Sequence, residues 1–311
     1  MISVFSAYIK GLQQAWHEKR LILVVYGFNL FFAYLITIPV SMMLEKGFAN
    51  RIAATEMLHK FDLTYYLTII RDFGAGLDVT RVILTFGLLY IVLNTFFAGG
   101  ILTLFHRQEK FTLGDFFSGC VEFFSRFLRL FLFSLILFLL SIIIFFLLGA
   151  LSGLITDNAA TEFWPFLLFF LREFLLVLLL LFFNIILDYA RIMTVVNDFH
   201  GMYQALKQAF MFVLMSMRRT MALYLLYLLT TVSLILMYLV VEHVLSVSSW
   251  ITVLLFFIWS QLFMIARMWS RLSLFAGQYI FYKFSNTAMP GMTKEMLDKA
   301  VMDYEARSVS S

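Results

Sequence analysis

Six long runs of apolar residues follow one another along the chain, separated by shorter and more polar segments. The runs cover about residues 21–43, 82–105, 130–153, 165–187, 220–241 and 249–266. A helix needs about 20 residues to cross hydrocarbon that is roughly 30 Å thick, and the runs are close to that length. Leu, Ile and Phe are continuous within them, without the alternation of polar and apolar residues that a membrane β-barrel requires. The pattern therefore predicts six transmembrane helices.

Three shorter segments place apolar residues on one side of a helix and polar residues on the other. They are residues 4–16, 112–124 and 199–213, and each precedes two of the long apolar runs. The first has Val4, Phe5, Tyr8, Ile9, Leu12 and Trp16 on its apolar side, and the third has Phe199, Met202, Tyr203, Leu206, Phe210 and Val213. Helices of this kind lie in the membrane interface, with the apolar side towards the acyl chains.

The three amphipathic segments also resemble one another. When they are superposed without gaps, Tyr8 aligns with Phe116 and Tyr203, and Gly11 aligns with Gly119. We interpret this as an internal repeat, with chance similarity between aromatic-rich segments as the alternative. The predicted fold is an all-α polytopic membrane protein. Its six transmembrane helices are arranged as three hairpins, each preceded by a cytoplasmic interfacial amphipathic helix.

The domain organisation follows from the same pattern. Residues 1–283 are expected to form a single transmembrane domain. Its first outer loop, residues 44–81, is expected to hold a small helical cap, and a plain connector is the alternative. Pro290 is expected to end the long last helix. Residues 284–311 would then form a cytoplasmic tail with a short amphipathic helix at Lys294–Ala306.

Composition supports membrane insertion. Hydrophobic residues make up 62% of the chain, charged residues make up 14%, and the mean hydropathy is +0.92. A water-soluble globule of 311 residues needs far more polar surface than this. The lipid bilayer is therefore the first partner that the sequence predicts.

Positive charges are concentrated on one side of the predicted spans. Of the 23 Lys and Arg residues, 17 lie before the first span, between the second and third, between the fourth and fifth, or after the sixth. The short loops on the other side, near residues 154–164 and 242–248, have none. Since Lys and Arg favour the cytoplasmic side, both termini are expected to be cytoplasmic. The net charge of +4 follows from this asymmetry and does not indicate nucleic-acid binding.

The residues that usually carry catalysis form no recognisable motif. The five histidines are dispersed, and the single cysteine, Cys120, excludes an internal disulfide. Asp188, Asp198 and His200 lie close together in the sequence at the predicted cytoplasmic boundary, where a metal or phosphate-ester site is conceivable. Nothing else converges on them by spacing, so we favour a solvated junction. The sequence thus assigns no catalytic, cofactor-binding or metal-binding residue, and no cofactor.

Four polar side chains lie inside the predicted spans. Asn29, Asn94, Asn184 and Gln261 each fall in the inner half of a different span. One interpretation is a polar pocket or a conduction path formed by the four side chains together. The other is interhelical hydrogen bonding, which contributes about 0.6 kcal/mol per bond in membranes. We favour the second interpretation and keep the four residues as a candidate intramembrane cluster.

Three charged residues are candidate intramembrane charges: Arg172, Glu173 and Glu242. Adjacent residues project about 100° apart on a helix, so Arg172 and Glu173 are not expected to pair with each other. Glu242, at the outer end of the fifth span, is the expected partner. A charge on a transport pathway and a structural pair near the outer boundary are the two interpretations, and the second is favoured.

Four short segments carry a resemblance to known proteins. DYARIMTVV, QALKQAFMFV, AGGILTLF and FTLGDFFSGC resemble segments of uncharacterised bacterial inner-membrane proteins with six helices. More distantly, the chain is similar to the membrane domain fused to some glycerophosphodiester phosphodiesterases. The resemblance implies a location in the bacterial inner (plasma) membrane. No segment of this sequence resembles the phosphodiesterase domain, so the resemblance assigns no catalytic residue.

For function, these observations favour a non-enzymatic role in membrane organisation or as the partner of another membrane complex. The charged inner side and the apolar face of the tail helix suit binding to a membrane protein or to a second copy of the chain. The alternative is a small-molecule or lipid transporter that uses the inner-leaflet Asn and Gln side chains. An intramembrane enzyme ranks third.

Overall fold

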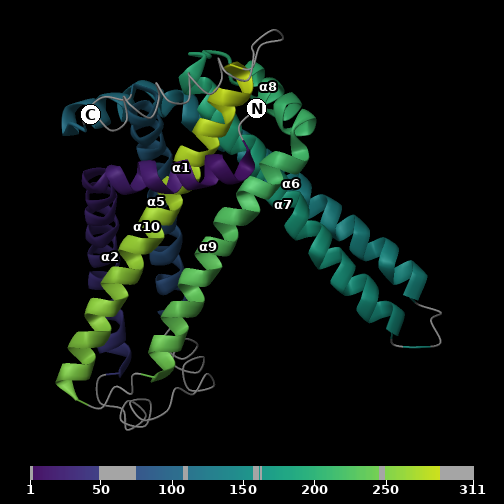
Figure 1. Ribbon diagram of the computed structural model, residues 1–311. Helices are drawn as coiled ribbons and strands as arrows, with labels where there is room; N and C mark the ends of the chain where they lie inside the picture. Colours follow the sequence, from purple (N-terminus) through teal and green to yellow (C-terminus); the bar gives the residue numbers. More distant parts are fainter. Residues whose placement is uncertain are drawn as a thin grey trace. The chain divides into compact units, whose positions relative to one another are not determined.

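The computed structural model describes residues 3–48, 75–107, 111–156, 161, 163–244 and 249–287. These residues form eight α-helices and, within those ranges, no β-strand (Figure 1). The helices are α1 (Val4–His17), α2 (Lys19–Phe48), α5 (Ala75–Arg107), α6 (Leu113–Thr156), α7 (Phe163–Val196), α8 (Met202–Met215), α9 (Met217–Val244) and α10 (Trp250–Thr287). Six of them, all except α1 and α8, are long and apolar enough to span a membrane. The protein is an all-α polytopic membrane protein, as the sequence predicts.

Several helices extend beyond their predicted bounds. Helix α2 continues to Phe48 and α5 begins at Ala75, so both ends of the expected loop 44–81 are helical. The rest of the expected outer cap and the expected tail helix Lys294–Ala306 lie outside the described residues.

The largest difference from the prediction concerns the second amphipathic segment. It is the first part of α6, which runs without interruption for 44 residues, so no separate helix ends before the third span. The reason is local, because Val121–Leu130 contains no proline or glycine. The helix also keeps one buried side through this segment, formed by Phe123, Phe127 and Leu130, so its packing favours continuation.

Contacts divide the chain into two compact units. One is Leu23–Asn94, and the other combines Met1–Ile22 with Thr95–Ser311. In the first unit, the ring of Phe32 on α2 lies 6.4 Å from the ring of Tyr90 on α5.

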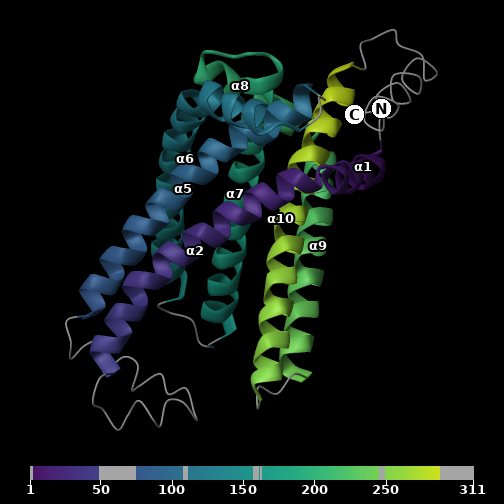
Figure 2. The same cartoon turned by 90° about the vertical axis from the view of Figure 1, so that its left-hand side faces the viewer.

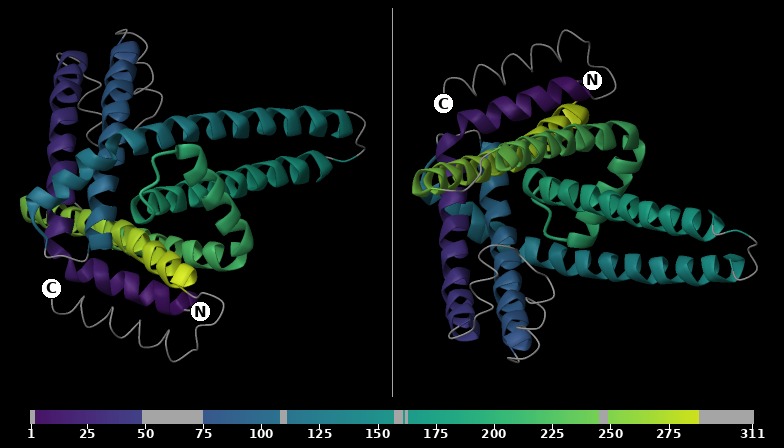
Figure 3. Two further views of the ribbon diagram at one scale, coloured as in Figure 1. Left: turned by 90° about the horizontal axis from the view of Figure 1, so that it is seen from above. Right: turned by 90° about the horizontal axis from the view of Figure 1, so that it is seen from below.

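In the second unit, α6 lies beside α7, and α9 lies beside α10 (Figures 2 and 3). Tyr238 on α9 packs on Phe263 of α10 with ring centroids 4.6 Å apart. Each of the two pairs is antiparallel.

Within the second unit, α1 packs on its neighbours through its smallest residues. Ser3 caps the helix, since its hydroxyl accepts from the backbone N–H of Ser6 at 3.1 Å. Ala7, Gly11 and Ala15 are the buried residues of α1, which crosses α10 (Figure 1). A Cβ on Gly11 would lie 2.7 Å from the Cα of Gly277, so the two backbones touch at this crossing.

Several bulky apolar residues of α1 and α8 are exposed. Phe5 and Trp16 of α1 are 61% and 59% exposed, and Tyr203 of α8 is 70% exposed. Helix α8 instead buries Ala205, Ala209 and other small or flexible side chains. Both helices therefore bury small residues and leave some bulky side chains uncovered, while Tyr8 and Phe212 pack on the rings of Tyr227 and Tyr189.

The buried positions bear on the predicted repeat. Ala7, Gly11 and Ala15 of α1 correspond in spacing to Ala205, Ala209 and Val213 of α8. That match requires a register three residues away from the superposition that aligns Tyr8 with Tyr203. The repeat stays a prediction, and its register would need this change.

The core of the second unit lies at one end of the long helices. In α7 the buried residues are all within Ile185–Val195, near its carboxyl end. In α9 they are Thr220, Leu223 and Tyr227, near its amino end. Since α7 and α9 run in opposite directions through the membrane, these segments are on the same side. The other ends of the spans expose Leu, Phe and Val side chains, as lipid-facing helices do.

Candidate functional site

Two of the four predicted amides lie in the unit Leu23–Asn94. The Nδ2 of Asn29 donates to the carbonyl oxygen of Val25 at 2.7 Å, and its Oδ1 accepts from the hydroxyl of Tyr90 at 2.8 Å. Asn94 donates from Nδ2 to the carbonyl oxygen of Tyr90 at 2.8 Å. Asn29 is thus bonded across α2 and α5 through Tyr90, which agrees with interhelical hydrogen bonding.

The other two amides belong to the second unit. Asn184 on α7 donates from Nδ2 to the hydroxyl of Tyr224 on α9 at 2.7 Å. Gln261 lies on α10. The four side chains therefore divide between two units, and a site shared by all four stays a prediction.

Arg172 and Glu173 form an ion pair with each other, contrary to the sequence-based expectation. Arg172 Nη2 lies 3.3 Å from Glu173 Oε1, while the expected partner Glu242 is exposed at the end of α9. The 100° separation is overcome because both side chains are long. The guanidinium lies over two rings, with its carbon 4.3 Å from the ring centre of Phe145 and 5.2 Å from that of Phe169.

The Arg172 guanidinium fills a gap that α6 leaves for it. A Cβ on Gly149 would lie 2.8 Å from Arg172 Nη1, so a larger residue there would displace the guanidinium. The Nε of Arg172 is buried and has no hydrogen-bond partner among the described residues. A guanidinium has five N–H donors, so this one retains capacity for another acceptor.

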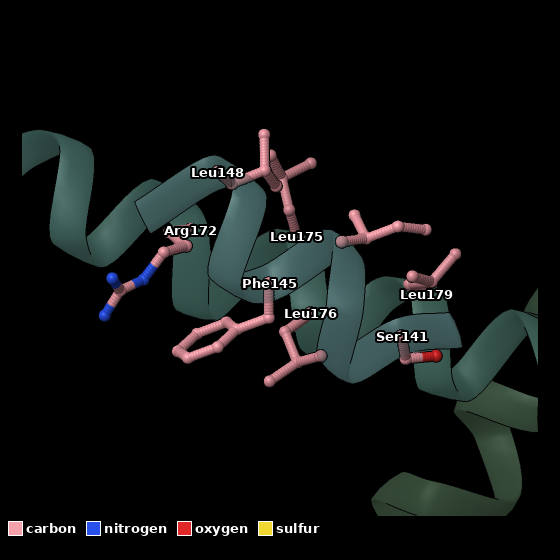
Figure 4. A pocket seen from close by; sticks show the side chains of 8 residues that line it. Ser141, Phe145, Leu148, Arg172, Leu175, Leu176 and Leu179 are labelled. Carbon is pink, nitrogen blue, oxygen red and sulfur yellow. The ribbon is translucent and has the colours of Figure 1, made fainter. Parts of the chain in front are cut away.

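A cavity of about 200 Å³ lies between α6 and α7, next to Arg172. Its lining comes from matching positions on the two helices: Ser141, Ile144, Phe145 and Leu148 on α6, and Arg172, Leu175, Leu176 and Leu179 on α7. Figure 4 shows Arg172 at one end of this cavity and Ser141 at the other. The Ser141 hydroxyl is satisfied by its own helix, since it donates to the carbonyl oxygen of Leu137 at 2.9 Å. Arg172 is therefore the one charged group at a largely apolar cavity.

Asp188 is buried, which corrects the prediction of a solvated junction. It is 5% exposed and accepts from Arg191 Nη1 at 3.0 Å. Its second carboxylate oxygen lies 3.5 Å from Nε2 of Gln278 on α10. A buried carboxylate is tolerated only with such partners, so this group ties α7 to α10 within the core.

Asp198 and His200 form a separate cluster around Arg126 of α6. The Arg126 guanidinium binds the Asp198 carboxylate and lies 3.2 Å from His200 Nε2. Asp198 has φ 49°, in the left-handed region that Asp and Asn adopt more readily than most residues. The hydrogen bond and charge of Arg126 lower the pKa of the exposed Asp198 carboxyl. This cluster fixes the turn between α7 and α8 against α6.

Asp188 does not join Asp198 and His200, because it faces the core while they face Arg126. Within the described ranges, no group of three or more His, Cys, Asp or Glu side chains is arranged to hold a metal ion. Cys120 is buried next to Gly100, where a Cβ would lie 2.6 Å from its sulfur. The arrangement of these groups is that of structural hydrogen bonds and ion pairs.

Sequence reasoning missed the cavity and the small-residue crossings. Both had a signal, because the cavity residues recur at i, i+3, i+4 and i+7 on each helix. Ala7, Gly11 and Ala15 recur every four residues in the same way. In α6 and α7 the spacing was hidden within segments that are apolar on every side, and in α1 it was hidden by larger apolar residues such as Phe5 and Trp16.

Three comparisons were made, with family models, with curated proteins and with solved structures, and none gives a match to this chain. The fold and the candidate site therefore rest on the residues and contacts described above. The resemblance to bacterial six-helix inner-membrane proteins stays an expectation from the sequence.

Proposed function

We propose that the protein is a non-enzymatic, membrane-organising protein that works as the partner of another membrane protein. The observation that supports this most is the uncovered apolar surface of the spans. None of the most apolar 18-residue stretch of α7 is buried by the chain, and only 6% is buried in α9 and α10. Lipid covers such faces in an isolated chain, and a second membrane protein can replace that lipid where the shapes fit.

The proposed location is the bacterial inner membrane, with both termini on the cytoplasmic side. The distribution of Lys and Arg supports this orientation. Six spans, an even number, would return the chain to the side on which it begins. The contact between Gly11 of α1 and Gly277 near the end of α10 is consistent with that arrangement.

The same proposal treats α1 and α8 as interfacial helices that introduce transmembrane hairpins. Both bury Ala or Gly and expose bulky apolar side chains such as Phe5, Trp16 and Tyr203. An amphipathic helix in the interface immerses such a face about 5–10 Å into the boundary between headgroups and acyl chains. This accounts for exposed aromatic residues outside the spans.

The transporter alternative has less support. Its candidate residues are engaged in hydrogen bonds, Asn29 with Tyr90 and Asn184 with Tyr224. Bonds of this kind favour structural attachment of one helix to another. The cavity between α6 and α7 is apolar apart from Arg172 and Ser141, which suits an acyl chain better than a polar solute.

Photo-crosslinking of the full-length chain in native membranes tests the partner proposal. A photoreactive amino acid at Phe170, which is 64% exposed on α7, should give a crosslinked product of discrete mass with another membrane protein. The matched control is Leu130 on α6, which is 0% exposed and should react only within the chain. If Phe170 yields lipid adducts alone and the chain purifies from mild detergent without a stoichiometric protein, the proposal is wrong.

A further inference from the structure

Arg172 and the cavity beside it have the features of a lipid-binding site. The lining residues are almost all Leu, Ile and Phe, which match an acyl chain in chemistry. Leu175 is 42% exposed, so the cavity opens at the surface of the hairpin, where lipid is present. Three features indicate which class of lipid fits the cavity. They are the depth of its charged end, the donors that Arg172 retains and the charge of Glu173.

The depth of Arg172 suits a headgroup. Arg172 and Arg191 are separated by about 29 Å along α7 at 1.5 Å per residue, close to the roughly 30 Å of the hydrocarbon core. If the inner boundary of the hydrocarbon is placed at Arg191, Arg172 falls at the outer boundary. Helical side chains also tilt towards the amino end, which in α7 leads away from the membrane centre.

The cavity extends from Arg172 in the direction of an acyl chain. Arg172 is at one end, and Ser141 and Leu179 are at the other (Figure 4). Leu179 is seven positions after Arg172 in α7, so the cavity reaches roughly 10 Å towards the membrane centre. A lipid with its headgroup at Arg172 would thus place several methylene groups inside the cavity.

The polar groups at the charged end match a zwitterionic headgroup. Arg172 is fixed against Phe145 and directs a planar guanidinium at this site, the geometry that binds phosphate well. Its only ion-pair partner among the described residues is Glu173, whose side chain is 41% exposed. The pair carries no net charge, so an anionic lipid would meet the Glu173 carboxylate as well as the guanidinium. A headgroup with a phosphate and an amine presents one opposite charge to each.

We propose that the cavity between α6 and α7 binds one acyl chain of a phosphatidylethanolamine-type phospholipid. The phosphate contacts Arg172, and the ammonium contacts Glu173. Lipid binding at this site needs no protein partner, so it can be tested independently of the function proposed above.

Native mass spectrometry of the full-length protein in mild detergent tests this site, with phosphatidylethanolamine, phosphatidylglycerol and a free fatty acid supplied in turn. The wild type should retain one phosphatidylethanolamine per chain in preference to the other two. Arg172→Gln should lower that retention about tenfold or more, because it removes a charge-assisted contact to phosphate. Glu173→Gln should abolish the preference over phosphatidylglycerol. Leu176→Trp, which fills the cavity, should reduce retention of both phospholipids.

Two further variants separate lipid binding from folding. Gly149→Ala keeps the charge of Arg172 but displaces its guanidinium, so it should weaken phosphatidylethanolamine retention as Arg172→Gln does. Arg218→Gln removes an exposed arginine outside the cavity and should retain lipid like the wild type. The proposal is overturned if Arg172→Gln and Gly149→Ala bind as the wild type does, or if phosphatidylglycerol or the fatty acid is preferred.

Discussion

The crossing of α1 and α10 permits a sharp prediction, because two glycines meet there. In Gly11→Ala the new methyl group would lie 2.7 Å from the backbone of Gly277 and would also contact the Tyr227 hydroxyl. Backbone cannot yield as a flexible side chain does, so α1 must move away from α10. That movement would break the hydrogen bond that the Tyr227 hydroxyl donates to the carbonyl oxygen of Tyr8 at 3.0 Å.

The expected loss in stability follows from these contacts. Overpacking a core costs about 1–3 kcal/mol. Leaving the Tyr227 hydroxyl buried without its acceptor costs about 1–3 kcal/mol more. Alanine offsets roughly 1 kcal/mol of this through its higher helix propensity. The net destabilisation is therefore about 1–5 kcal/mol, or a fall of roughly 2–8 °C in apparent Tm for a chain of 311 residues.

Thermal unfolding of the purified protein in one detergent, at one scan rate, measures this change. The matched control is Gly27→Ala, since nothing lies within 4 Å of a Cβ built there. That control should leave the apparent Tm unchanged or raise it slightly. Tyr227→Phe should lower it by less than Gly11→Ala, because it removes only the hydrogen bond. If Gly11→Ala is as stable as Gly27→Ala, the close crossing does not exist as described.

Three more predictions concern the inner side of the spans. Arg126 lowers the pKa of Asp198, so the pair stabilises the fold at pH values above the usual pKa of an aspartate. This stabilisation is lost as the pH falls through the lowered pKa. The apparent Tm of Asp198→Asn should therefore fall less than that of the wild type between pH 7 and pH 3. Asp188→Asn should lower the free energy of unfolding by about 3 kcal/mol because it leaves Arg191 without its carboxylate. The double variant Asp188→Leu with Arg191→Leu should lower it by less. Equal losses of unfolding free energy in the two variants would contradict a buried pair. Cys120 is 0% exposed, so a maleimide should modify it only after denaturation, and rapid labelling of the folded protein would contradict the packing against Gly100.

Much of the fold is predictable from the sequence because membrane-spanning helices require apolar runs of about 20 residues, which are easily recognised. The six apolar runs contain few polar residues, and a helix is the structure that satisfies its own backbone in hydrocarbon. The ends of the helices were less predictable. Nothing in Val121–Leu130 marks a stop, so the amphipathic start of α6 and its span became one helix.

The packing was harder to predict than the helices. Phe5 and Trp16 dominate the periodic signal of α1, yet the face that packs is the one with Ala7 and Gly11. Small residues add little to a hydrophobic pattern, although they decide where two helices approach. The burial of Asp188 depends on Gln278, which is 90 residues later, and a local charge pattern holds no information about such a partner.

The candidate site shows the same limit. The pairing of Arg172 with Glu173 was not expected, because the side chains leave the helix about 100° apart. The deciding contacts come from the facing helix, where Phe145 supports the guanidinium and Gly149 leaves room for it. The spacing of the cavity residues was visible in the sequence, but the pairing of α6 with α7 at that register was not.

The central claim is that helices outside the spans lie in the membrane interface and introduce the hairpins. The most direct test is the depth of a spin label at position 203 of α8, in a Cys120→Ser background and in lipid bilayers. Tyr203 is 70% exposed, so a label there should not disturb the packing of α8. We predict that the label lies at the boundary between headgroups and acyl chains. A label near the bilayer midplane, or one fully in water, would contradict it.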